Sequence, residues 1–205
     1  MRIIGAMAAV AVVAVAGVGL ATTTAEAEPK QACELAAEWV EVNRSSLPTT
    51  LVELSSHSMP YRQAIVAALP HEVQVELWRE HLTTSLESPT TFTEPQRALI
   101  EGVIADLDFY MDPANKAAVD SLRTRVLESF TVNEARPIFA TLGPEEVMTT
   151  GVSATGLAGG CECEYGDNYC FNSWCNKGGC DAGGRCGTLW LDACDGTCGG
   201  PRPTD

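Results

Sequence analysis

The apolar residues between positions 28 and 147, called the body below, recur at the spacing of helix faces. Apolar side chains three and four positions apart line one side of a helix. Four runs follow this pattern: Leu35-Trp39-Val42, Val73-Leu77-Trp78-Leu82, Leu99-Ile100-Val103-Ile104-Leu107 and Val119-Leu122-Val126-Phe130. The body therefore predicts an all-α region of five to seven short helices. Its length of about 120 residues suffices for one buried core.

Helix start signals agree with these runs. Thr50 stands three positions before Glu53, and Thr93 stands three positions before Gln96. This spacing is typical of capping boxes, in which each side chain satisfies a backbone N–H group of the other residue. The two signals predict helices that begin just after positions 50 and 93.

Residues 161–205, called the tail below, follow no helical pattern. They hold eight of the nine cysteines and nine of the eighteen glycines, but only three Leu, Ile, Val or Phe residues. So few apolar side chains cannot offset about 1–2 kcal/mol of backbone entropy per ordered residue. Small exported domains are stabilised instead by disulfides, each worth about 2–4 kcal/mol. We therefore expect a small disulfide-rich, loop-dominated C-terminal domain after the helical body.

Two further segments complete the predicted organisation. Arg2 is the only charge before an apolar run over 3–20, and Ala27 ends a small-x-small pattern. This arrangement predicts a secretory signal peptide over residues 1–27, cleaved after Ala27, rather than a membrane anchor. Residues 148–160 are small and uncharged, which is typical of a flexible linker. The predicted segments are thus 1–27, 28–147, 148–160 and 161–205.

Export predicts an oxidising destination, where clustered cysteines form disulfides. The tail contains neither Cys-x2-Cys nor histidine, so we expect no metal site. Cys161 and Cys163 are too close to pair with each other, and the sequence leaves the remaining pairing open. Outside the tail, we expect Cys33 to be a small buried residue. The eight predicted disulfide cysteines are Cys161, Cys163, Cys170, Cys175, Cys180, Cys186, Cys194 and Cys198.

Charge and motif content narrow the function. The formal net charge is −14, so the chain has no basic footprint for nucleic acid. The three histidines, His57, His71 and His81, all lie in the body, and no nucleophile or metalloprotease motif accompanies them. We therefore expect no enzyme, no catalytic residues and no cofactor.

At the tail the sequence resembles a known family. The Cys-x-Cys-x6-Cys opening from Cys161 to Cys170, with Tyr169 before the third cysteine, is similar to the fulvocin C-related bacteriocins. The segment Cys186-Gly187-Thr188 followed by Trp190 resembles the same family, and residues 61–80 look like its precursors' helical region. The resemblance implies a secreted bacteriocin precursor that releases a disulfide-stapled peptide against competing bacteria.

This reading assigns roles and partners. Processing is expected at Gly159 and Gly160, because exposed linkers of small residues are cleavable. Four aromatic residues are candidates for target binding, with packing on the disulfides as the alternative: Tyr169, Phe171, Trp174 and Trp190. The expected partners are a receptor or envelope component of a target bacterium, an immunity protein and a processing protease. An exported, non-toxic binding or structural module with a cysteine-rich knob remains the alternative function.

Overall fold

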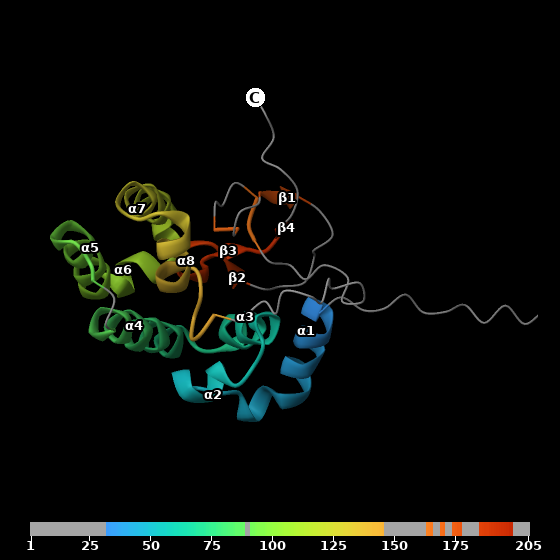
Figure 1. The fold of residues 1–205 in the computed structure, drawn as a ribbon. Coiled ribbons are helices and arrows are strands. Elements are labelled where there is room, and N and C mark those ends of the chain that lie inside the picture. Colours follow the sequence, from blue (N-terminus) through green and yellow to red (C-terminus); the bar gives the residue numbers. More distant parts are fainter. Residues whose placement is uncertain are drawn as a thin grey trace, which may run out of the picture.

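The computed structural model describes residues 32–88, 91–145, 163–165, 169–170, 174–177 and 185–198 (Figure 1). The predicted signal peptide with Ala27 and the predicted linker with Gly159 and Gly160 lie outside these residues. The described body is helical, as predicted. Its α-helices are α1 (Ala32–Asn43), α2 (Leu51–Ser55), α3 (Met59–Ala68), α4 (His71–Glu87), α5 (Glu94–Ala105), α6 (Leu107–Met111), α7 (Lys116–Ser129) and α8 (Val132–Phe139). Two 3₁₀ turns, η1 (Arg44–Ser46) and η2 (Pro113–Asn115), join them.

The described residues form eight α-helices, one more than the upper end of the predicted number. One reason is that the apolar run over 99–107 belongs to two helices. The chain leaves helical geometry at Asp106, which ends α5 and precedes α6. The second reason is that α2 is a helix of only five residues.

The two predicted capping boxes lie at helix starts. Thr93 accepts the N–H of Gln96 while the Gln96 side chain accepts the N–H of Thr93, so α5 begins with a complete box. Thr50 accepts the N–H of Glu53 at the start of α2, but the Glu53 carboxylate accepts the N–H of Thr49, one position before the predicted partner. A third box, formed by Thr131 at the start of α8, was not predicted from the sequence.

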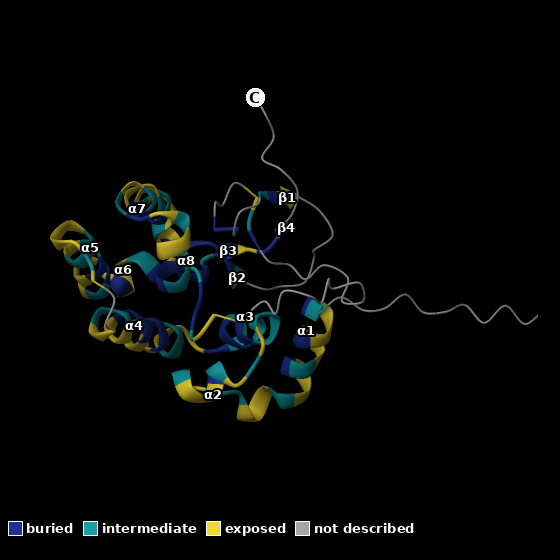
Figure 2. Ribbon diagram, viewed as in Figure 1, coloured by how far each residue is buried: buried dark blue, intermediate teal, exposed yellow. Residues whose placement is uncertain are grey.

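One apolar core runs through the body (Figure 2). Helix α4 contributes Leu77, Trp78 and Leu82, all of which are almost completely buried. This placement follows from the predicted stripe, because those residues lie on one face of the helix. The same core also includes the tail residues Tyr169, Leu189 and Trp190. The body and the described part of the tail therefore share their apolar interior.

The predicted face of α1 was wrong, although the helix itself is present. Leu35 is 39% exposed and Val42 is 85% exposed. The buried face instead carries Cys33, Ala36 and Val40. The reason is that α1 packs mainly on α3, and close helix packing favours the small side chain of Ala36 over larger ones.

The tail contributes four short strands and one 3₁₀ turn. These are β1 (Cys175–Lys177), β2 (Arg185–Cys186), η3 (Thr188–Trp190), β3 (Asp192–Ala193) and β4 (Gly196–Cys198). β1 pairs with β4 and β2 pairs with β3, both antiparallel. In Figure 1, β2 and β3 lie next to the helices, and β2 contacts α3. The tail is thus attached to the body through β2 and η3.

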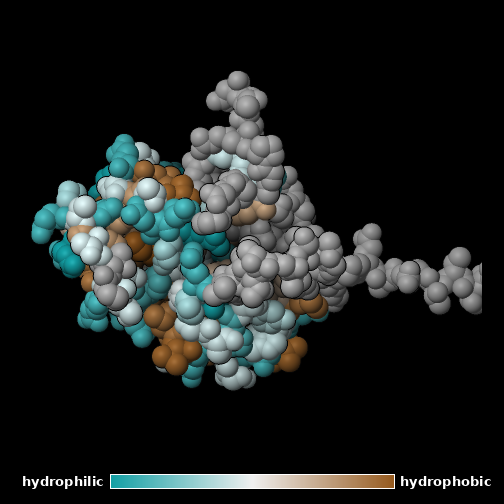
Figure 3. Space-filling view, in the orientation of Figure 1, coloured by the Kyte–Doolittle hydropathy of each residue, from teal (hydrophilic) through white to brown (hydrophobic). Residues whose placement is uncertain are grey.

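The visible surface of the helices is mixed. Figure 3 shows apolar residues in separate small groups among hydrophilic ones. Among the described residues, none of the helices combines the length and the apolar character needed to cross a bilayer.

Candidate functional site

Three disulfides cross-link the described part of the tail. They join Cys163 to Cys175, Cys170 to Cys198, and Cys186 to Cys194. Six of the eight predicted cysteines are therefore in disulfides, and Cys161 and Cys180 lie outside the described residues. Each of the three bonds joins two tail residues. The cross-links among the described residues thus fix the tail to itself and not to the body.

Two of the disulfides lie side by side at the β1–β4 pair. Cys175 and Cys198 are direct partners in the strand register, and Cys163 forms an isolated bridge with Gly196. A Cβ atom at position 196 would lie only 2.6 Å from the Cys175 sulfur and 2.7 Å from the Asn176 carbonyl oxygen. Glycine at this position therefore permits the close approach of the two strands.

The sulfur atoms of Cys163, Cys170 and Cys198 lie within 4.8 Å of one another. A cysteine binds zinc as a thiolate, whereas each of these three sulfur atoms is bonded to another sulfur. This cluster could hold a metal ion only after reduction. The cluster in the oxidised tail is therefore a cross-linked core.

The turn over residues 187–190, called the tail turn below, inserts into the body. Trp190 is 2% exposed, and its indole packs edge-to-face on that of Trp78 with a centroid distance of 5.7 Å. Its Nε1–H donates a hydrogen bond of 2.9 Å to the carbonyl of Ala140, at the end of α8. Aromatic burial and a satisfied N–H group together stabilise this position of the ring.

The backbone of the tail turn is strained. Leu189 and Trp190 have φ angles of 56° and 53°, in the left-handed region that side chains other than glycine rarely adopt. Each such residue costs about 1–2 kcal/mol. The burial of Leu189 and Trp190 offsets this, since a fully buried large apolar side chain contributes about 1.5–3 kcal/mol. The body therefore supports a conformation that the tail turn would not favour in solvent.

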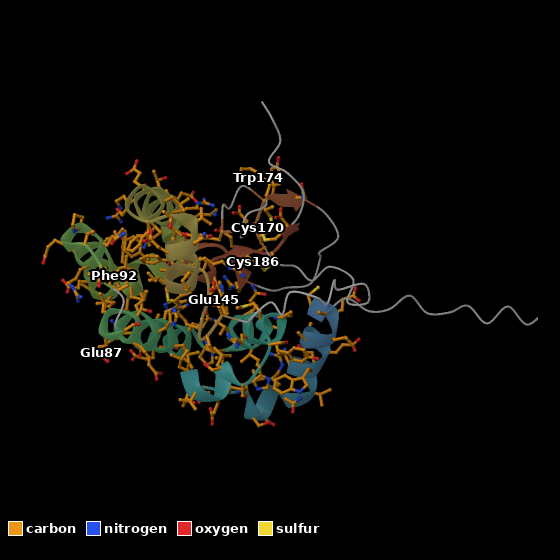
Figure 4. The ribbon with its side chains drawn as sticks, in the orientation of Figure 1. Glu87, Phe92, Glu145, Cys170, Trp174 and Cys186 are labelled. Atoms are coloured by element: carbon orange, nitrogen blue, oxygen red, sulfur yellow. A yellow bond between two sulfur atoms is a disulfide. The ribbon has the colours of Figure 1, made fainter. Side chains whose placement is uncertain are left out.

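The predicted target-binding residues fall into three groups. Tyr169 and Trp190 are buried in the full chain, and the Tyr169 hydroxyl shares a hydrogen bond with Thr188. Trp174 is half-buried beside β1, on the side away from the helices (Figure 4). Phe171 lies outside the described residues. Neither proposed interpretation foresaw that Trp190 would pack on the body, because that contact joins residues distant in the sequence.

Two ion pairs accompany the tail turn. Lys116 of α7 pairs with Asp192, which is 8% exposed, and Arg123 of α7 pairs with Glu164 at 3.0 Å. The hydrogen bond to Asp192 raises the pKa of the Lys116 ammonium. Burial, followed by the negative charge of Asp192, raises the pKa of the Glu164 carboxyl although Arg123 acts in the opposite direction. Helix α7 therefore presents two cations to two anions of the tail.

A second contact covers the Cys186–Cys194 disulfide. Cys33 of α1 is buried, as predicted, and forms an apolar cluster with Cys186 and Cys194. Gln63 of α3 donates a hydrogen bond of 3.5 Å to the Cys186 sulfur. Figure 4 shows that Cys186 lies nearer the helices than Trp174 does. No local sequence pattern marks Gln63 or Trp78 as a tail contact.

The three histidines are placed separately. His57 packs with Trp39, and His71 is exposed at the start of α4. His81 is buried, and burial lowers its pKa. Its Nε2 lies 2.9 Å from the Pro137 carbonyl, and its Nδ1 lies 3.4 Å from the Gly143 amide nitrogen. These contacts fit a structural role for His81 at the end of α8.

The combined geometry describes a cross-linked tail held on a helical body by one indole, two ion pairs and a covered disulfide. No protein-family model, no curated protein and no solved structure matches the chain.

Proposed function

We propose that the chain is a secreted bacteriocin precursor whose disulfide-stapled tail inhibits competing bacteria after release from the helical body. The observation that carries the proposal is the distribution of cross-links. All three described disulfides lie within the tail, and the described contacts with the body are non-covalent. Once the linker is cut, the tail would therefore have no described covalent bond to the body and would keep its own cross-links on leaving it.

The disulfides support the same proposal. Disulfides are typical of extracellular proteins, because the cytosol keeps thiols reduced. The residues that carry the resemblance to fulvocin C-related precursors also take part in the tail's structure. Cys163 and Cys170 are both in disulfides, and Thr188 and Trp190 form the tail turn. The proposed destination is the extracellular medium, after cleavage of the signal peptide.

The proposed mode of action is recognition through aromatic side chains. The tail has seven acidic and three basic residues, a net charge of −4, so attraction to anionic lipids does not favour membrane lysis. Aromatic rings provide a large contact area at small entropic cost. Tyr165, which the sequence reasoning left out, is 52% exposed, whereas Trp190 becomes available only after release. The proposed target is a receptor or envelope component.

One observation favours the alternative of an intact exported binding or structural module. Tyr169, Leu189 and Trp190 belong to the same apolar core as the helices. Residues that share a core usually fold and unfold together. In this alternative the tail stays on the body permanently and presents its outer side, with Trp174 and Tyr165, to a partner.

A growth-inhibition assay separates the two functions. The oxidised full chain is cleaved in the linker, and the tail is isolated in denaturant, which leaves its disulfides intact. We expect the tail to inhibit related bacteria, and the uncleaved chain and the isolated body to be inactive. The matched control is the tail of the double variant Cys170→Ala/Cys198→Ala, which lacks one described cross-link. The bacteriocin proposal would be contradicted if neither the isolated tail nor the full chain inhibited growth.

A further inference from the structure

We infer that the helical body is a specific binding site for the tail and keeps the tail bound after the linker has been cut. The inference deepens the proposed function, on which it rests for its biological meaning: hydrolysis alone would yield an inactive complex, and dissociation would be a second step. The ligand of this site is the chain's own tail turn together with the acidic residues beside it.

The central contact has the character of an interface hot spot. The Trp190 indole is 2% exposed, lies against Trp78 and donates its N–H to the Ala140 carbonyl. Dominant binding residues are enriched in tryptophan, tyrosine and arginine and lie in well-packed pockets that exclude water. Trp78 is itself completely buried in the full chain, so water is excluded from the contact between the two rings.

The tail turn has a backbone conformation that depends on its surroundings. Leu189 and Trp190 both have left-handed φ angles, and both side chains are buried. Strained conformations persist only where their surroundings determine them. Here the surroundings are supplied by the body, since η3 contacts α7 and Trp190 contacts α4 and α8. We expect the turn to relax when the tail leaves.

Two ion pairs between α7 and the tail fix the orientation of the tail on the body. Lys116 and Arg123 lie two turns apart on α7, and they pair with Asp192 and Glu164 of the tail. Complementary charge fixes register and excludes incorrect partners. The pairs also bracket the tail turn along the sequence, because Glu164 precedes it and Asp192 follows it. A tail bound in another position would leave the nearly buried Asp192 without Lys116.

The test is native gel filtration of the cleaved full chain. A site-specific protease sequence is inserted between Leu157 and Ala158, and the oxidised protein is cut there. We expect body and tail to elute together in native buffer and to separate in denaturant. Elution as two separate species in native buffer at micromolar concentration would overturn the inference.

Matched tryptophan variants test the central contact. We expect Trp190→Ala to weaken the affinity of the cleaved tail for the body by about 30-fold, the effect of losing a hot spot. Trp174→Ala, in the same tail but on the side away from the helices, should change the affinity by less than about threefold. Equal effects of the two substitutions would contradict the proposed site.

A second test exchanges the charges of Lys116 and Asp192, and it remains informative if the Trp190→Ala variant does not fold. Lys116→Asp and Asp192→Lys should each weaken the complex, and the double variant should recover most of the lost affinity. Absence of recovery in correctly oxidised protein would contradict the proposed register. Growth inhibition is read separately. Co-elution together with an inactive isolated tail supports the binding site and contradicts the bacteriocin proposal, whereas separation together with an active tail does the reverse.

Discussion

Arg62 and His81 fix the segment that leads from α8 toward the linker. The Arg62 guanidinium is buried and donates hydrogen bonds to the carbonyls of Leu142 and Pro144 at 3.3 and 2.6 Å. His81 contacts the Gly143 amide nitrogen at 3.4 Å and packs edge-to-face on Trp78. His81 therefore connects the end of the body with the ring that supports Trp190, and Arg62 holds the same segment from α3.

Replacement of Arg62 tests the first of these contacts. Arg62 uses its three guanidinium nitrogens to donate to four carbonyls, because Nε and Nη2 also donate to His57 and Ser55. The single nitrogen of lysine cannot replace all of these bonds, so Arg62→Lys leaves a buried acceptor unsatisfied. We expect a loss of about 1–3 kcal/mol in the free energy of unfolding, measured with urea. Arg125→Lys, at an exposed position of α7, should have almost no effect. Equal stability of the Arg62→Lys variant and the parent would contradict the assigned role.

The pH dependence of stability tests His81. Burial holds its pKa below the value of about 6.5 in the unfolded chain. The neutral ring therefore contributes fully above pH 6.5, and the contribution is lost as the pH falls toward the folded pKa. We expect the free energy of unfolding of the parent protein to decrease from pH 7 to pH 5. The decrease should be smaller in the His81→Gln variant. His71→Gln, at an exposed position of the same helix, should retain the parent's slope.

At the scale of elements, the sequence predicted helices better than it predicted which faces are buried. The buried face of α4 was predicted correctly, because Leu77, Trp78 and Leu82 lie together on its one apolar face. On α1, Leu35 and Ala36 lie on adjacent stripes, and packing against α3 selected the stripe with the smaller residue. Such a choice depends on the partner helix, which the local pattern does not contain.

The capping box of α5 offers an element-scale prediction. Thr93 caps the helix, and the Gln96 side chain also donates a hydrogen bond of 2.9 Å to the Ser129 carbonyl at the end of α7. We expect Thr93→Ala to lower the free energy of unfolding by about 1 kcal/mol. Thr91→Ala, two positions earlier and exposed, is the control. A larger loss for Thr91→Ala would exclude the capping explanation.

The described disulfides with the longest and the shortest loop should differ in how much they stabilise the tail. Cys170 and Cys198 are separated by 28 positions, whereas Cys186 and Cys194 are separated by 8. Chain entropy assigns about 3–4 kcal/mol to the longer loop and about 2–3 kcal/mol to the shorter. We therefore expect Cys170→Ala/Cys198→Ala to accelerate proteolysis of the tail more than Cys186→Ala/Cys194→Ala does. The opposite order would show that packing under α1 and α3 outweighs loop length.

For the whole molecule, the predicted division into a helical and a cysteine-rich part agrees with the structure, whereas the way the parts meet was not predictable. The tail's rings were expected to bind a target or to pack on the disulfides. Trp190 instead packs on Trp78, 112 positions earlier in the chain. Contacts over such a distance depend on the complete fold. Among the aromatic candidates, the structure therefore identifies the contact of Trp190 with Trp78 as one whose role can be tested.

Mass spectrometry of the culture fluid, under denaturing but non-reducing conditions, tests most directly whether the tail is a detachable cross-linked unit. We predict a fragment that begins within residues 158–161 and gains eight hydrogens on reduction, since all eight tail cysteines would be oxidised. Detection of the intact chain alone, or of a tail whose cysteines react with a thiol reagent before reduction, would contradict the account.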